Sequence, residues 1–236
     1  MKQILWLTLL IAMSIQGRGW AEECLSCHRQ RDAVVTAAWE KSRHAMAEVT
    51  CTACHGVAHD GGMTARARRN EACTTGCHPR ENGSHALSKH GVIAVMEGER
   101  LDFNLPLKEG NQRTPTCAYC HMHANEHDTA KVSRDIPCRD CHSPRFVETW
   151  FASGDQMVAI GDMKLREAEA VAAGSNDPEM RDLLHRMRDV HLRNVRLGVG
   201  HASPDDQWWH GHPALDGDLL RIKSLMQTLH NRNQSR

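Results

Sequence analysis

The ten cysteines of this 236-residue chain fall into five pairs, and a histidine follows the second cysteine of every pair. The five sets are Cys24, Cys27 and His28; Cys51, Cys54 and His55; Cys73, Cys77 and His78; Cys117, Cys120 and His121; and Cys138, Cys141 and His142. The spacing Cys-x-x-Cys-His is typical of covalent c-type haem attachment. Both thiols bond to the porphyrin, and the adjacent imidazole binds the iron as an axial ligand. The sequence therefore predicts five covalent haem c groups.

Two other uses of paired cysteines fit this sequence less well. Zinc ribbons contain Cys-x-x-Cys pairs and disulfide frameworks need an even number of cysteines, but neither requires a histidine after each pair. The third set, C-T-T-G-C-H from Cys73 to His78, has one extra residue between its cysteines. Attachment there needs an adjusted geometry, and an unloaded or singly linked haem is the alternative for this set.

Twelve further histidines are available as ligands on the opposite side of each iron. From their local contexts, five are expected to complete bis-histidine haems: His44, His59, His90, His127 and His201. Other candidates are His85, His123, His185, His191, His210 and His212, whereas His230 is expected at the surface. Methionine ligands would raise the reduction potential, and the alternatives of this kind are Met46, Met96 and Met122.

The N-terminus has the pattern of a secretory signal peptide. Lys2 precedes an apolar run from Ile4 to Ile15 that is short for a membrane span. Gly19 and Ala21 fit a small-x-small cleavage site. We expect residues 1–21 to be removed, leaving an exported, periplasmic protein that does not span the membrane. An uncleaved N-terminal anchor is the alternative.

Lysine and arginine together balance aspartate and glutamate at 29 each, so the formal charge is zero. Haem propionates would make the loaded protein more acidic, because the charge of a cofactor belongs to the electrostatics of its site. A short basic run, Arg66, Arg68 and Arg69, is interpreted as a partner for propionates or as a solvated face. Nothing in this pattern indicates binding to nucleic acid.

Residues 22–145 contain all five cysteine sets and are predicted to form a pentahaem cytochrome c domain. They supply about 25 residues for each haem, too few for an ordinary side-chain core. Aromatic residues make up only 4% of the chain, and strand-like alternation is nearly absent. We therefore expect short helices and loops around stacked haems, ordered by haem attachment.

Residues 146–236 lack cysteine and are predicted to form a C-terminal region of three helices. Apolar residues at i+3 and i+4 spacing place the helices at about 146–173, 178–198 and 215–229, with a loop at 200–211. The side chains expected to face a core are Val147, Trp150, Phe151, Met157, Val158, Leu165, Ala168, Met180, Leu183, Leu184, Met187, Val190, Leu215, Leu219, Ile222, Met226 and Leu229. The fold class is thus mainly α. We expect this region to pack on the haems and supply ligands; a plain bundle used for association is the alternative.

Several stretches resemble the hydroxylamine oxidoreductase-like octahaem cytochromes. They are A-W-E-K-S-R-H-A (Ala38–Ala45), N-E-A-C-T-T-G-C-H (Asn70–His78), S-K-H-G (Ser88–Gly91), T-P-T-C-A-Y-C-H-M (Thr114–Met122), C-R-D-C-H-S-P-R-F (Cys138–Phe146) and L-G-V-G-H-A-S-P (Leu197–Pro204). The resemblance covers most of the mature chain and is strongest after residue 114. By analogy, it implies a homo-oligomer, such as a trimer, formed through the C-terminal helices.

The chain departs from that family in two respects. Five haem sets are present instead of eight, and the missing block would contain the family's catalytic, open-coordinated haem. Oxidative members also crosslink that haem to a tyrosine in the loop before the last helix. The corresponding loop here reads D-D-Q-W-W-H-G-H, and the chain's single tyrosine, Tyr119, lies inside a haem set. A crosslinked site that oxidises hydroxylamine is therefore not expected.

These observations leave three hypotheses for function. The first is an electron-transfer protein whose bis-histidine haems connect redox partners, either other cytochromes or a membrane quinol-oxidising complex. The second is a small multihaem reductase or oxidoreductase of nitrogen or sulfur compounds, such as nitrite or hydroxylamine. It would have one open-coordinated haem at the third set, near Arg80, His85 and Lys89. The third is a structural or docking subunit of a larger multihaem complex. We favour the electron carrier.

Overall fold

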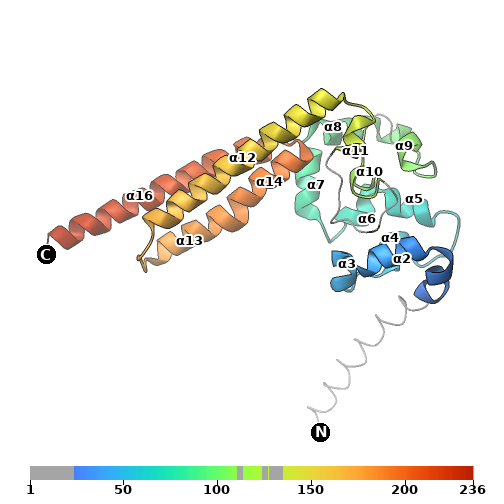
Figure 1. The fold of residues 1–236 in the computed structure, drawn as a ribbon, viewed down its shortest axis with the longest axis horizontal. Helices are drawn as coiled ribbons and strands as arrows, with labels where there is room; N and C mark the ends of the chain where they lie inside the picture. Colours follow the sequence, from blue (N-terminus) through green and yellow to red (C-terminus); the bar gives the residue numbers. More distant parts are fainter. Residues whose placement is uncertain (1–23, 111–113, 124–126, 128–134, 236) are drawn as a thin grey trace, which may run out of the picture. The chain divides into compact units, whose positions relative to one another are not determined.

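The computed structural model describes residues 24–110, 114–123, 127 and 135–235 (Figure 1). The predicted signal peptide lies outside the described residues. Within the described parts of the chain, all regular secondary structure is helical, which confirms the mainly α fold class. Among these residues, no helix combines the length and the apolar composition that a membrane crossing needs.

The chain divides into two compact units. The first consists of the described residues up to Cys77 together with Glu97–Cys138, and the second of His78–Met96 together with Arg139–Arg236. The segment that follows the third cysteine set therefore groups with the C-terminal helices. These two units do not test the boundary at residue 145, and the extent of the haem-binding domain stays a prediction.

The first unit is built from short helices joined by loops. Residues 24–31 are helical, and the following elements are α2 (Ala33–Glu40), α3 (Arg43–Met46), α4 (Cys51–His55), α5 (Met63–Arg68), α6 (Asn70–Thr74), the 3₁₀ turn η1 (Gly98–Arg100), α9 (Leu107–Gly110), α10 (Cys117–His121) and α11 (Ile136–Arg139). Its buried apolar cluster is small and consists of Leu107, Ala118 and Tyr119, with Cys120 and Met122 packed against it.

Arginine side chains hold the loops of this unit. The Arg66 guanidinium donates from Nε to the carbonyl of His55 at 2.9 Å. Arg68 donates to the carbonyl of Phe103 at 3.1 Å, and the Arg69 guanidinium lies over the Phe103 ring, 4.7 Å from its centre. The guanidinium groups of the basic run are thus engaged with the backbone and with an aromatic ring, although Arg69 is exposed and Arg66 and Arg68 are only partly buried.

The second unit contains the long helices. Its elements are α7 (Pro79–Ala86), α8 (Lys89–Glu97), α12 (Pro144–Val171), α13 (Pro178–Arg186), the π-helical turn η3 (Met187–His191), α14 (Leu192–His201), α15 (Pro204–Trp208) and α16 (His212–Gln234). Figure 1 shows α12 and α16 running side by side, with α13 and α14 alongside them. The three predicted helices are confirmed. The region 200–211 is not a plain loop, because it contains α15.

Local signals explain where the bundle helices begin and end. The Asp177 carboxylate accepts a hydrogen bond from the backbone N–H of Met180 at 3.1 Å, and Pro178 occupies the first turn of α13. Gly174, with φ of +79°, follows the end of α12 in the left-handed conformation that glycine adopts without strain. These signals act within a few residues, so the sequence predicts them well.

The bundle has one continuous apolar core. The buried side chains are Leu165, Ala168, Ala172, Met180, Leu183, Met187, Leu192, Val195, Leu215, Leu219 and Ile222. Two residues predicted to face this core are instead exposed, Trp150 by 37% and Val190 by 36%. Val190 lies in the π-helical turn, whose extra residue rotates the helix face. Trp150 stacks on Phe146 on another face of α12.

Candidate haem-binding sites

The second and fourth cysteine sets each form one short helix, α4 and α10. Within a helix, residues at i, i+3 and i+4 lie on the same face. Both thiols and the histidine of such a set are therefore presented together. The first set begins the helix at residues 24–31 and has the same spacing. None of the ten cysteines is paired in a disulfide, so each thiol remains available for a thioether bond to a haem.

Cysteines of successive sets are neighbours within the first unit. Two pairs of thiols are hydrogen-bonded: Cys24 with Cys51, and Cys73 with Cys117. Others are close enough to interact electrostatically: Cys54 with Cys73 and Cys77, and Cys120 with Cys138. The backbone N–H of Cys117 also donates to Oδ1 of Asn70 in α6 at 2.9 Å. The sets thus follow one another in space in the order of the sequence.

Most of these thiols are held in the neutral form. Burial, and then the neighbouring thiol, raises the pKa of Cys51 and Cys54. The same two causes raise the pKa of Cys120 to about 12. The hydrogen bond with Cys117, together with burial, raises the pKa of Cys73. Adjacent sulfurs can lie close together because they do not carry like charges near neutral pH.

The third set does not form one helix. Helix α6 ends at Thr74, Thr75 is extended, and Gly76 has φ of +82°. The extra residue is therefore accommodated in a turn. Cys77 follows this turn, and His78 directly precedes α7. This set has the same functional groups as the others, but its second cysteine and its histidine are positioned by the turn at Gly76 rather than by helical spacing.

Three motif histidines face a second imidazole at the same distance. The ring centres of His28 and His59, of His55 and His127, and of His90 and His142 are each 6.1 Å apart. A metal–imidazole bond is about 2.0 Å long, and the ring centre lies about 1 Å beyond the nitrogen. Two imidazoles that bind one iron from opposite sides therefore have centres roughly 6 Å apart. The spacing of the three pairs fits a haem iron between the rings.

Burial also favours the protonation state that iron needs. It lowers the pKa of His55, with His127 as the next cause. It likewise lowers the pKa of His90, with His142 as the next cause. A neutral imidazole has a free lone pair, whereas an imidazolium does not. These side chains are therefore suited to bind a metal at neutral pH.

A serine cap positions His90. The Ser88 hydroxyl is buried, donates to the carbonyl of His85 at 2.6 Å and accepts from the N–H of Gly91 at 3.0 Å. A Cβ atom on Gly91 would lie 1.9 Å from the same carbonyl oxygen, so only glycine fits there. The stretch S-K-H-G thus starts α8 with a fixed direction for its second residue, His90.

The stretch S-R-H-A repeats this arrangement in the first unit. Ser42 is buried, and its hydroxyl accepts from the backbone N–H of Ala45 at 3.2 Å. His44 is the second residue of α3, as His90 is of α8. The shared pattern of serine, a basic residue and histidine therefore encodes a capped helix start that presents an imidazole.

Close backbone packing positions His201, the last residue of α14. Ala202 caps this helix with φ of +57°. A Cβ atom on Gly198 would lie 2.7 Å from Cγ of Gln207 in α15, so this glycine allows the two helices to approach. The ring of His201 lies edge-on to that of His85, with centres 6.4 Å apart. Neither of these two histidines belongs to a cysteine set.

The ligand roles of all ten predicted histidines stay predictions. His44, His78 and His121 are placed at the start of α3, before α7 and at the end of α10, respectively. Among the alternative ligands, Met46 is 76% exposed and Met96 is 79% exposed, whereas Met122 packs against the small core of the first unit.

Two carboxylates near motif histidines were not predicted from the sequence. Oδ2 of Asp32 lies 2.7 Å from Nδ1 of His28. Oε2 of Glu81 lies 3.8 Å from Nδ1 of His78. Histidine ligands usually donate their second ring N–H to such a group, which fixes the tautomer and leaves Nε2 for the metal. The sequence feature that indicates such a carboxylate is an acidic residue three or four positions after the motif histidine.

The remaining histidines have contacts outside the cysteine sets. His185 is largely exposed beside Asp189, and Nε2 of His230 lies 2.7 Å from Nε2 of Gln234. His191 Nε2 is 3.2 Å from Oδ2 of Asp218, which also binds Arg186. The others contact neighbouring residues as follows: His123 lies edge-on to the ring of Tyr119, the backbone carbonyl of His210 accepts from Asn194, and His212 lies beside Lys164.

Two of the three residues suggested to surround an open third haem, Arg80 and His85, interact with residues of α14. Nη2 of Arg80 donates to Oδ1 of Asn194 at 2.6 Å. His85 faces His201. These groups are therefore already used for packing α7 against α14, and the geometry gives no particular support to an anion site.

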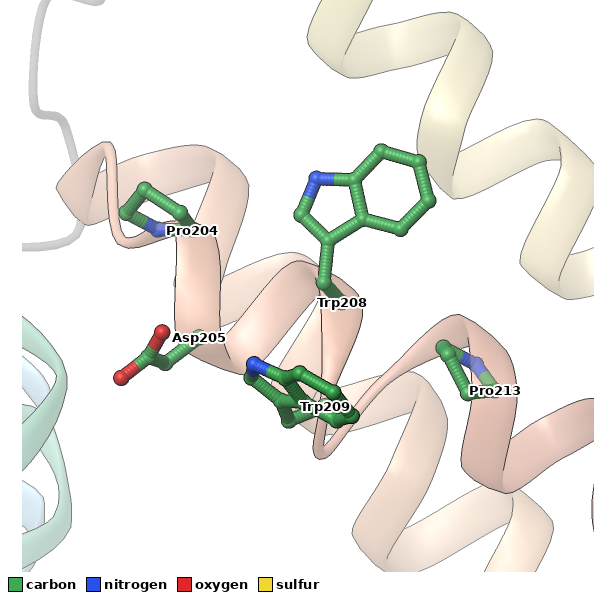
Figure 2. Close-up of a pocket in the computed structure, with 5 residues that line it drawn as sticks. All are labelled: Pro204, Asp205, Trp208, Trp209 and Pro213. Atoms are coloured by element: carbon green, nitrogen blue, oxygen red, sulfur yellow. The ribbon is translucent and has the colours of Figure 1, made fainter.

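A surface hollow of about 300 Å³ lies at α15, lined by Pro204, Asp205, Trp208, Trp209 and Pro213. Figure 2 shows the two indole rings pointing in different directions from the end of α15. Trp208 is 58% exposed and Trp209 is 74% exposed. The lining contains no cysteine and no predicted iron ligand, so this hollow is not one of the candidate haem sites.

Comparison with known proteins places the chain. A solved structure of the reducing HAO-like protein complex Kustc0457/Kustc0458 of Kuenenia stuttgartiensis contains a chain of similar fold, with a TM-score of 0.57 and 16% sequence identity. The match covers 92% of this chain and 87% of that one. A family model described as "Seven times multi-haem cytochrome CxxCH" matches residues 9–137, more than half of the sequence. The family indicates covalently bound haem c and haem-based electron transfer, and this chain belongs to the multihaem cytochromes with CxxCH motifs.

Proposed function

We propose that this protein is a periplasmic pentahaem c-type cytochrome that passes electrons between redox partners through bis-histidine haems. The observation that carries the proposal is the common 6.1 Å spacing of three imidazole pairs, each containing one motif histidine. Haem iron with two imidazole ligands changes its valence without binding substrate. The contacts between cysteines of successive sets support electron transfer from each haem to the next.

The protein's own groups hold the ligands in place. Asp32 orients His28 through Nδ1, and Ser88 fixes the helix that presents His90. Burial keeps His55 and His90 neutral. Because these positions are set before any electron arrives, reduction and oxidation require little rearrangement of the protein.

Spectroscopy of the purified holoprotein tests this function. Mass spectrometry should give five haems, and electron paramagnetic resonance (EPR) should show low-spin signals only. Addition of nitrite, hydroxylamine or cyanide should leave the spectra unchanged. A high-spin signal that shifts with these ligands would instead support an enzyme with an open haem.

The ligand pairs are tested by substitution. His59→Ala should convert one haem to high spin, because its ring faces His28 at 6.1 Å. His185→Ala is the matched control, since this side chain is 74% exposed and bound to Asp189. Five low-spin haems in the His59→Ala variant would contradict the assigned pair.

Export and partners belong to the same proposal. We expect the mature protein to begin near Glu22, which N-terminal sequencing of protein from the periplasmic fraction would establish. The expected partners are other cytochromes or a membrane quinol-oxidising complex. Light scattering would show whether the C-terminal helices form a homo-oligomer. A single protomer mass would argue against that arrangement.

A further inference from the structure

An aromatic stack leads away from the histidine of the fifth cysteine set. The ring of Phe146 lies nearly parallel to that of His142, with centres 4.7 Å apart and planes at 26°. Trp150 continues the stack beyond Phe146, with centres 6.3 Å apart and planes at 19°. Phe146 and Trp150 are four positions apart in α12 and therefore lie on one face of that helix. His142 lies two residues before the helix, and its ring meets that of Phe146 through the direct stacking contact.

This stack does not serve the apolar core of the bundle. Phe146 is 50% exposed and Trp150 is 37% exposed, and neither belongs to the buried cluster. The backbone at Phe146 is nevertheless fixed, because its N–H donates to the Ser143 hydroxyl at the start of α12. A half-exposed phenyl ring that stacks on an imidazole, carried by a backbone fixed at the helix start, indicates a role toward that imidazole.

The imidazole of His142 faces His90 at 6.1 Å, with an angle of 47° between the ring planes. An axial imidazole that is bound only through Nε2 can still rotate about its metal–nitrogen bond. The angle between two axial imidazole planes determines how the iron d orbitals split, and thus the EPR signal and the reduction potential of the haem. A ring stacked on one imidazole restricts this rotation.

We infer that Phe146 is a positioning residue that fixes the imidazole plane of His142 and thereby sets the spectroscopic and redox properties of the fifth haem. Trp150 supports Phe146 from the other side. The inference rests on the proposed function in one respect, namely that His90 and His142 bind the same iron. The two rings then have different roles, since the imidazole binds the iron and the phenyl ring sets the orientation of the imidazole.

The variant pair Phe146→Leu and Phe146→Tyr tests this role in the full-length holoprotein. Leucine removes the stacking face, whereas tyrosine keeps it. Phe103→Leu is the matched control, because that phenyl ring lies against Arg69. His90→Ala identifies the low-spin signal of the fifth haem by removing it. Mass spectrometry counts the haems, and EPR and redox titration supply the readouts.

Phe146→Leu should shift the low-field EPR signal that His90→Ala abolishes, together with the midpoint potential of one haem. Phe146→Tyr should restore both, Trp150→Leu should give a smaller shift, and Phe103→Leu should give none. Where Phe146→Leu reduces haem loading, Trp150→Leu gives the decisive comparison.

The inference is overturned if the EPR signal and the midpoint potential of the fifth haem stay at wild-type values in Phe146→Leu. If Phe146→Leu loses haem, wild-type values in Trp150→Leu overturn it instead. His90→Ala would still create a high-spin haem in that case, and the proposed function would stand. If His90→Ala leaves every haem low-spin, the ligand pair itself is wrong, and the proposed bis-histidine site fails with it.

Discussion

In the C-terminal bundle, eleven buried apolar side chains form one core that joins α12, α13, α14 and α16. Among the described residues of the unit that contains most of the cysteines, the corresponding cluster has three members, Leu107, Ala118 and Tyr119. The helices there are mostly four to eight residues long, shorter than a helix that is stable by itself in water. The difference indicates that side chains stabilise the bundle, whereas the cysteine-rich unit depends on its attached porphyrins.

Removing the haems should have the largest effect and should act on one region only. We expect full-length protein produced without haem attachment to keep slow amide exchange within residues 144–234. Exchange within residues 24–77 and 97–110, which belong to the first unit, should accelerate by at least about 100-fold, because attachment and folding are coupled there. Hydrogen–deuterium exchange with mass spectrometry measures both regions in one sample. Equal protection in both would contradict the contrast.

A cavity in the bundle core should come next in magnitude. Leu215 is fully buried in α16, so Leu215→Ala should lower the free energy of unfolding by about 2–5 kcal/mol. Leu220 lies on the same helix and is 65% exposed, and Leu220→Ala should change stability by less than about 0.5 kcal/mol. Denaturation followed by far-ultraviolet circular dichroism gives both values. A similar loss in the two variants would mean that the core is not where the structure places it.

A substitution at Gly76, in the turn of the third cysteine set, should have a smaller effect on stability than the cavity in the bundle core. Gly76→Ala should cost about 1–2 kcal/mol, because an alanine is strained at φ of +82°. We also expect less haem at this set, as judged by the mass of the holoprotein. Gly83 lies within α7 with open space at its Cβ position, so Gly83→Ala should be neutral or stabilising. Full loading and unchanged stability in Gly76→Ala would show that the turn tolerates a side chain.

The smallest expected effect is a pH dependence within the bundle. Burial, and then the charge of Lys164, lowers the pKa of His212, whose Nδ1 is 3.4 Å from the Lys164 ammonium. In the unfolded chain the His212 side chain has a pKa of about 6.5. Just below that pH it therefore binds more protons in the unfolded chain than in the folded protein. Stability should therefore fall as the pH decreases below about 6.5, by less than about 1 kcal/mol after solvent screening.

His212→Asn should remove this part of the dependence. The difference in unfolding free energy between wild type and variant, measured at pH 7.5 and at pH 5.5, isolates the contribution of this side chain. A difference that is the same at both pH values would show that His212 does not titrate between them.

Much of the bundle could be predicted from sequence because its signals are local. Asp177, Pro178 and Gly174 determine helix ends through their own backbone preferences. The π-helical turn at Met187–His191 could not be predicted, since it depends on packing and changes which side chains face inward. The stack of Phe146 on His142 also follows from three-dimensional placement, because a periodic apolar pattern does not distinguish a core position from an aromatic contact.

The candidate haem sites show the same limit. The cysteine sets and their histidines are contiguous in sequence, and S-R-H-A and S-K-H-G carry their own caps. Asp32 beside His28 could have been recognised from its spacing. The grouping of His78–Met96 with the C-terminal helices could not, because nothing in the local sequence specifies which distant helix a segment contacts.

The order in which the cysteine sets adjoin one another has a consequence for the overall rate of electron transfer. Cys73 of the third set interacts electrostatically with Cys54 of the second set and is hydrogen-bonded to Cys117 of the fourth, so in the proposed series of haems this set is the middle member. In a series, the slowest exchange limits the current through every other member, and a defect at the centre separates the two ends. In the proposed electron carrier, the set built around the Gly76 turn is thus where a single substitution would restrict conduction between the first two sets and the last two.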